Sequence, residues 1–166
     1  MILSTHAVLG AAVARLFPHN PVLGFFLGFI SHFVFDAIPH WDYSLRSEVL
    51  GDKKEIVDMR WGKDFLFDIF RLGLDFAAGV GIVFIFFPLH GGKDLASLLA
   101  GLMGGVLPDA LQFFYFKIKK EPLSSLQRFH KFIQSKLTLK HQPRLGIPLQ
   151  GIIGVAAIVL SLILRG

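Results

Sequence analysis

Residues 22–38 read VLGFFLGFISHFVFDAI and are almost entirely apolar. As an α-helix this segment would extend about 26 Å, close to the roughly 30 Å hydrocarbon core of a membrane. His32 and Asp36 are four residues apart, so one face of such a helix carries both. Ionisable groups are costly inside a membrane and usually face a bundle interior or a wet cavity. The segment therefore predicts a membrane helix that carries a polar site.

Four further segments of the chain are similarly apolar. Together they predict helices at about 2–17, 22–38, 65–87, 95–116 and 147–164. Segments of roughly 17–23 residues can cross a bilayer, and the first two are at the short end of this range. We therefore expect an all-α fold, a polytopic membrane bundle of about five apolar helices in a single domain over residues 1–166.

The composition supports this class of protein. Hydrophobic residues make up 53% of the chain and charged residues only 17%, which is more apolar surface than a soluble domain of this size can bury. The net charge of +5 does not indicate a nucleic-acid partner, because the basic residues lie in two loops beside apolar segments. The chain has no Cys, which excludes a disulfide framework, a thiolate metal site and a Cys nucleophile.

The distribution of Lys and Arg predicts the orientation of the bundle. Most of them lie in loops 39–64 and 117–146, which fall on one side if all five segments span, and the opposite turns hold only Lys93. The positive-inside rule then places both loops and the N-terminus in the cytoplasm. Arg15 and Arg165 are expected near the other face, with side chains that extend to the interface.

A short amphipathic helix is predicted at about 124–137. Ser124 is the expected N-cap, with Gln127 completing a capping box. Its apolar face would carry Leu126, Phe129, Ile133 and Leu137, so the helix is expected to lie flat on an anionic membrane surface. His130 is assigned to the surface of this helix, from which it could cover a site below.

A faint internal repeat relates two helical hairpins. Gly28 aligns with Gly101, and Asp36 aligns with Asp109. The alignment predicts a pseudo-symmetric core in which each hairpin contributes one Asp from its second helix. Gly24 and Gly28 also form a small-xxx-small pair, which predicts close helix packing.

Five ionisable residues of the apolar segments are expected in one layer near the cytoplasmic face. They are His6, His32, Asp36, Asp75 and Asp109, at depths of roughly 3–15 Å. Imidazoles and carboxylates form a ligand set suited to Zn, Mn or Fe. We predict a divalent metal, first of all Zn, held by the two His and by Asp36 and Asp109, with Asp75 as a general base or further carboxylate.

The site has neighbours and local alternatives. His40 and Asp42 follow the second helix in the run Pro39-His40-Trp41-Asp42 and could extend the site as catalytic residues. His32 and Asp36 could instead be a simple hydrogen-bonded pair, and Trp41 an interfacial anchor. Asp68 is expected to form a structural ion pair with Arg71, three residues further along the helix.

Three motifs resemble those of the predicted membrane-bound metal-dependent hydrolases, of which the LexA-regulated inner-membrane proteins are one branch. They are Thr5-His6, Leu107-Pro108-Asp109, and the run from Ser31-His32 through Asp36 to Asp42. The resemblance implies metal ligation by His6 and Asp109 and, by analogy, by His32 and Asp36. It also implies a prokaryotic inner-membrane location. Two features of the family are missing: Ala110-Leu111 follows Asp109 where a second Asp is typical, and there is no Thr-His-Ser motif.

The sequence therefore predicts a membrane-embedded hydrolase in which metal-activated water attacks an ester or phosphoester. Membrane lipids are the expected partners and a lipid headgroup linkage the expected substrate. One alternative is a small ion- or proton-coupled transporter, which with so few helices would require a homodimer. Another is a non-enzymatic membrane scaffold whose polar layer only fixes helix packing.

Overall fold

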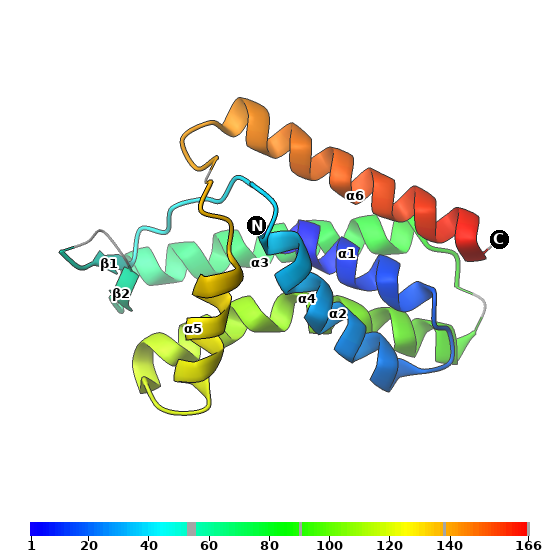
Figure 1. Ribbon diagram of the computed structural model, residues 1–166, viewed down its shortest axis with the longest axis horizontal. Coiled ribbons are helices and arrows are strands. Elements are labelled where there is room, and N and C mark those ends of the chain that lie inside the picture. The colour runs from blue at the N-terminus through cyan, green and yellow to red at the C-terminus, as the bar shows by residue number, and fades with distance from the viewer. Residues whose placement is uncertain (53–55, 90, 138, 166) are drawn as a thin grey trace.

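The computed structural model describes residues 1–52, 56–89, 91–137 and 139–165, and their fold is mostly helical (Figure 1). The helices are α1 Leu3–Arg15, α2 Pro21–Asp36, α3 Lys63–Phe86, α4 Gly92–Ile118, α5 Leu123–Ile133 and α6 Pro143–Arg165. A two-stranded antiparallel hairpin, β1 Glu48–Leu50 and β2 Ile56–Met59, lies in the loop between α2 and α3. The all-α class is confirmed, and this hairpin is its one addition among the described residues.

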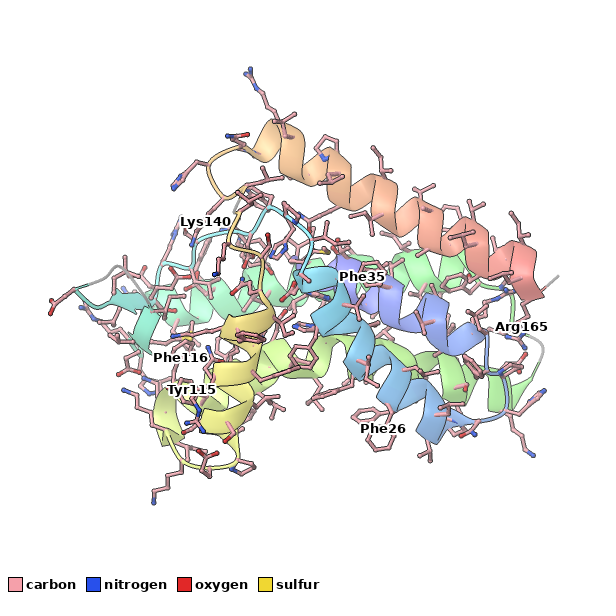
Figure 2. The ribbon with its side chains drawn as sticks, in the orientation of Figure 1. Phe26, Phe35, Tyr115, Phe116, Lys140 and Arg165 are labelled. Carbon is pink, nitrogen blue, oxygen red and sulfur yellow. The ribbon has the colours of Figure 1, made fainter. Side chains whose placement is uncertain are left out.

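Three helices, α3, α4 and α6, are long and apolar enough to cross a membrane, and α2 is a shorter apolar helix. Large apolar side chains on their outer faces are exposed, such as Ile85 on α3 at 76%. Phe26 of α2 likewise points away from the bundle (Figure 2). Apolar surface on this scale is unusual for a soluble monomer and is typical of contact with lipid. The structure thus agrees with an integral membrane protein.

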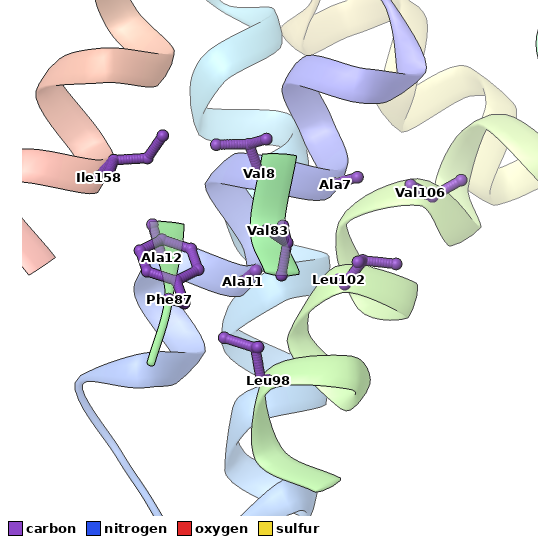
Figure 3. Packing of buried hydrophobic residues seen from close by; sticks show 10 residues of the cluster. All are labelled: Ala7, Val8, Ala11, Ala12, Val83, Phe87, Leu98, Leu102, Val106 and Ile158. Carbon is purple, nitrogen blue, oxygen red and sulfur yellow. The ribbon is translucent and has the colours of Figure 1, made fainter. Parts of the chain in front are cut away.

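Helix α1 is the centre of the bundle. It packs against α2, α3, α4 and α6, and nearly all of its residues are buried. Its small side chains Ala7, Ala11 and Ala12 meet apolar residues of α3, α4 and α6 in one core cluster (Figure 3). Because α1 is enclosed by other helices, its 13 residues need not match the bilayer thickness.

Glycines allow α1, α2 and α4 to approach backbone to backbone. A Cβ placed on Gly28 of α2 or on Gly10 of α1 would collide with the carbonyl oxygen of Gly101 in α4. Gly24 lies similarly against Ser97. The close packing predicted from Gly24 and Gly28 is therefore confirmed, and the two glycines matched in the internal repeat, Gly28 and Gly101, touch each other.

The helix boundaries differ from the predicted ones by a few residues, with local reasons. Helix α2 starts one residue earlier than predicted, because Asn20 accepts a hydrogen bond from the amide of Leu23 and Pro21 occupies the first turn. Arg15 does not extend to the interface: it is buried, and its Nη1 donates to the carbonyl of Ser161 in α6. Arg165, whose Nη2 donates to Asp94 Oδ2 (2.8 Å), ties the end of α6 to α4.

Asp68 anchors the loop that precedes the hairpin. Its carboxylate accepts hydrogen bonds from the amides of Arg46 and Ser47 and from the Ser47 hydroxyl, at 2.7–3.1 Å. The predicted ion pair with Arg71 is wrong, because both oxygens of Asp68 are used by this loop and Arg71 lies over the Tyr43 ring. The sequence showed no strand alternation there, so the hairpin was not predicted.

Helix α5 is shorter than predicted and presents a different face to the bundle. Pro122 is its N-cap residue and no side chain at that position accepts a hydrogen bond, so the predicted capping box of Ser124 is wrong. The Glu121 carboxylate instead accepts a hydrogen bond from the Ser125 amide. The helix ends at Ile133, and Leu137 is exposed beyond it. The residues that α5 buries are Gln127 and His130.

Candidate metal centre

Four imidazoles surround one carboxylate, that of Asp36 at the end of α2. His6 Nε2 lies 3.1 Å from Asp36 Oδ1, and His40 Nε2 lies 3.7 Å from the same oxygen. His130 Nε2 lies 2.8 Å from Oδ2, and His32 Nε2 lies 3.4 Å from it. The Met1 amine is also 3.0 Å from Oδ1. All of these groups are buried, and they come from α1 and the residue Met1 before it, from α2 and the loop after it, and from α5.

The α2 sequence positions the first part of the centre. His32 and Asp36 are one turn apart and point the same way, as their spacing predicted. After α2 ends, the chain turns so that His40 also faces Asp36, and His40 Nδ1 lies 2.8 Å from the carbonyl of Ile38. Burial lowers the pKa of His40, which favours its neutral form.

A carbonyl of α4 sets the tautomer of His32. His32 Nδ1 lies 2.8 Å from the Gly105 carbonyl oxygen, which can only accept, so Nδ1 carries the proton. The lone pair of His32 is then on Nε2, which faces the centre. Pro108 lacks an N–H, so the helical hydrogen bond to the carbonyl of the neighbouring Gly104 is absent in this turn.

His6 reaches the centre from the start of α1. Its ring stacks on His32 at a centroid distance of 3.9 Å. Within the described residues neither ring nitrogen of His6 has a partner with hydrogen-bond geometry, although Nε2 is close to Asp36. A fully buried imidazole in this state is unusual, because buried polar atoms are normally satisfied.

Asp109 is the second carboxylate at the centre. It follows Pro108 on α4, and its Oδ1 lies 3.7 Å from His32 Nε2. Its side chain is 24% exposed, whereas that of Asp36 is 1% exposed. Asp109 lines both of the cavities described below, and Asp36 lines only the second. The structure thus brings together His6, His32, Asp36 and Asp109, the four residues that the sequence singled out as ligands.

Sequence reasoning did not place His130 in the site. It is only 2% exposed, and its Nδ1 lies 2.7 Å from the side-chain amide nitrogen Nε2 of Gln112 in α4. Donation from this amide makes Nδ1 an acceptor, so His130 Nε2 carries a proton that it donates to Asp36. The pair Gln127 and His130, two polar residues one turn apart on an amphipathic helix, was the only local signal of an inward polar face.

The residues predicted to be catalytic lie in different places. His40 contacts Asp36 as described, and Asp42 lines the cavities beside the centre. Burial raises the pKa of Asp42 to about 6. Asp75 lies outside the centre: its Oδ2 accepts from the Ser4 amide and the Tyr43 hydroxyl, at 3.2 Å each. Asp75 thus accepts from the Ser4 N–H, which has no partner within the first turn of α1. This contact fixes the turn of α1 that carries His6.

The spacing of the donor atoms suits a metal ion. In each of two overlapping groups, His6/His32/Asp109 and His32/Asp36/His130, one side-chain N or O atom per residue lies within 4.8 Å of the others. Because His130 donates its Nε2 proton to Asp36, the available ligands are His6, His32, Asp36 and Asp109. Two ligands bound tetrahedrally at about 2.1 Å are about 3.4 Å apart. The separations of 3.1 Å between His6 and Asp36 and 3.4 Å between His32 and Asp36 are close to this value. The unpartnered nitrogens of His6 also fit a role as metal ligand.

Comparison of the chain with protein-family models, with curated proteins and with solved structures found no match. The geometry of the centre itself therefore carries the functional argument.

Proposed function

We propose that this protein is a membrane-embedded, metal-dependent hydrolase that acts on an ester or phosphoester, with a lipid linkage as the substrate. The convergence of His6, His32, Asp36 and Asp109 from three helices carries the proposal. Each of these residues, which are distant in sequence and costly to bury, lies 3.1–3.7 Å from another member of the set, and a shared ligand explains that cost better than separate local contacts do.

In this proposal the four residues hold a divalent cation, Zn in the first place and Mn or Fe otherwise. When bound, such a cation supplies Lewis acidity and an activated water nucleophile. His32 is oriented for ligation by Gly105, and His130 holds Asp36 through a proton on Nε2. Outer contacts of this kind fix the orientation and basicity of metal ligands.

Asp36 lies where it could take the role of a carboxylate that the family resemblance leads one to expect and the sequence lacks. In the predicted membrane-bound metal-dependent hydrolases a second Asp follows the Leu-Pro-Asp motif, where this chain has Ala110-Leu111. Asp36 is the buried carboxylate nearest to the imidazoles, at 2.8 Å from His130 and 3.1 Å from His6. We therefore infer that Asp36 replaces the missing carboxylate.

We further propose that α1, α2, α3, α4 and α6 form a five-helix polytopic bundle with the N-terminus in the cytoplasm. Helices α3, α4 and α6 have the length to span, and α2 at 16 residues reaches about 24 Å. The loops rich in Lys and Arg border the end that carries the hairpin and α5 (Figure 1). This arrangement puts the centre near the cytoplasmic face, at the depth of lipid headgroup linkages.

Metal analysis of the detergent-purified protein tests the proposal. We expect a stoichiometric divalent metal in the wild type and its loss in His32→Ala and Asp109→Ala. The matched control is His141→Ala, which removes an exposed loop imidazole and should leave the metal content unchanged. Turnover of phospholipid vesicles, followed by mass spectrometry, should be lost in the same two variants only.

A folded wild type that binds no Zn, Mn or Fe after dialysis against each metal would refute the proposal. Folding of each variant is monitored by size-exclusion chromatography and helical circular dichroism, so that loss of metal is separated from loss of structure. Ion flux in proteoliposomes without lipid turnover would favour the transporter instead.

A further inference from the structure

A large apolar cavity adjoins the centre. Its volume is about 590 Å³, within the range of about 300–1,000 Å³ that is typical of small-molecule sites. Phe65, Ile69 and Leu72 of α3 form one wall, and Val106 and Phe113 of α4 form the other. The hairpin and the start of α1 close the remaining sides.

The cavity has one apolar and one polar end. Apart from Tyr43 and Lys117, every polar side chain that lines it also lines a second cavity of about 430 Å³. These shared residues are Asp42, Glu48, Asp109 and Gln112. The two cavities are therefore contiguous, and the residues that line both include Asp109 of the candidate metal centre.

The second cavity has a basic lining from α5 and the loop after it. Lys131 of α5 and Lys136 and Lys140 of that loop line this cavity, and none of the three lines the apolar one. Lys140 lies on the α5–α6 loop, and Phe116 lies toward the hairpin end of the bundle (Figure 2). The order along the two cavities is thus an apolar chamber, the His/Asp centre, and a group of lysines.

We propose that the substrate is an anionic phospholipid whose acyl chain lies in the apolar cavity between α3 and α4 and whose phosphate faces Lys131, Lys136 and Lys140. This inference rests on the proposed function and names the substrate class of that same centre. The scissile ester of such a lipid lies between chain and phosphate, which corresponds to the place of Asp109 between the two cavities.

Charge and access agree with this occupant. Asp42, Glu48 and Asp109 line both cavities. A divalent cation held by the centre would offset their charge and leave the lysines to bind the phosphate. Ile69, which is 44% exposed, lies both in the cavity wall and on the outer surface of α3. An acyl chain can therefore enter from the bilayer, whereas a soluble phosphoester would leave this apolar wall uncovered.

Photo-crosslinking tests the inference independently of hydrolysis. The protein is reconstituted into phosphatidylcholine vesicles that contain trace phosphatidic acid with a diazirine in its acyl chain. We expect crosslinks to concentrate on peptides 61–72 and 106–117 and to be severalfold weaker on α6. Excess unlabelled phosphatidic acid should suppress the signal, and inorganic phosphate or further phosphatidylcholine should not.

Two pairs of variants localise the effect. Lys136→Gln/Lys140→Gln should weaken crosslinking by about fivefold for each lysine, whereas Lys119→Gln/Lys120→Gln removes the same charge outside the cavity and should change little. Ile69→Trp narrows the chamber at its wall toward the bilayer and should weaken the crosslinks. Its control, Ile163→Trp on the exposed face of α6, should not.

The outcomes separate this inference from the proposed function. Uniform labelling of α3, α4 and α6, or equal losses in both lysine pairs, would overturn the lipid site even if the protein binds metal and hydrolyses a soluble ester. Crosslinks that are confined to the peptides lining the apolar cavity and suppressed by unlabelled phosphatidic acid, in a protein that binds no metal, would support the lipid site and reject the hydrolase. Protein–protein crosslinks that show a second polypeptide in the apolar cavity would also overturn the lipid site.

Discussion

At the scale of single residues, carboxylates in this chain do two different tasks. Asp36 collects imidazoles at the candidate metal centre, whereas Asp68 and Asp75 accept backbone N–H groups. All three are membrane-helix carboxylates in the sequence, and nothing in their own spacing distinguishes them. The distinction arises from which backbone groups lack partners nearby, because an unsatisfied buried N–H costs about as much as a lost hydrogen bond.

Replacement of Asp68 should show the structural role of such a carboxylate. Asp68→Ala leaves three donors of Arg46 and Ser47 without their acceptor, so we expect a loss of about 2–4 kcal/mol in unfolding free energy. Denaturant unfolding in detergent measures it. Asp64→Ala, in the exposed first turn of α3, is the control and should cost less than about 1 kcal/mol. Equal effects of the two changes would contradict the anchoring role.

At the scale of helices, close backbone contact positions the centre. Gly28 and Gly101 let α2 and α4 touch, and this contact brings His32 to the Gly105 carbonyl. The same helix pair presents Asp36 and Asp109 to the imidazoles between them. A small change in the distance between these two helices would therefore alter stability and site geometry together.

Gly28→Ala tests this contact. The added Cβ meets backbone atoms of Gly101, which cannot rotate away as a side chain would, so the helices must separate. We expect a loss of about 2–3 kcal/mol in unfolding free energy and weaker metal binding. The control is Gly73→Ala on α3, where open space surrounds the new methyl group; it should be neutral or stabilise by up to about 1 kcal/mol. An unchanged stability of Gly28→Ala would show that α2 and α4 do not pack this closely.

At the scale of the whole molecule, the two ends of the bundle differ in chemistry. The hairpin, α5 and the lysines lie at one end, and the far end is tied by Arg15 to Ser161 and by Arg165 to Asp94 (Figure 1). The candidate centre lies toward the first end, beneath α5. This polarity is what the proposed orientation in the membrane requires.

Cysteine accessibility tests the orientation. The chain has no Cys, so single replacements can be labelled without background. We expect Leu89→Cys, in the turn between α3 and α4, to react with a membrane-impermeant maleimide in intact cells. Ser125→Cys, exposed on α5, should react only after the cells are opened. The reverse pattern would invert the bundle and place the centre on the outside.

The sequence alone determined the helical class, the approximate positions of the apolar helices and the shared face of His32 and Asp36. These properties depend on apolar length and on the helical repeat, both of which are local along the chain. Gly24 and Gly28 likewise predicted close packing because a missing side chain is a local property.

Only the tertiary structure decided which polar groups meet. It placed His130 of α5 against Asp36, and it gave Asp75 the Ser4 amide at the start of α1 as a partner. It also placed Asp68 under the amides of the loop that precedes the hairpin. The physical reason is that a buried polar group selects its partner from whatever neighbouring helices present. That choice depends on how helices distant in sequence pack, and the spacing within any one helix does not contain it.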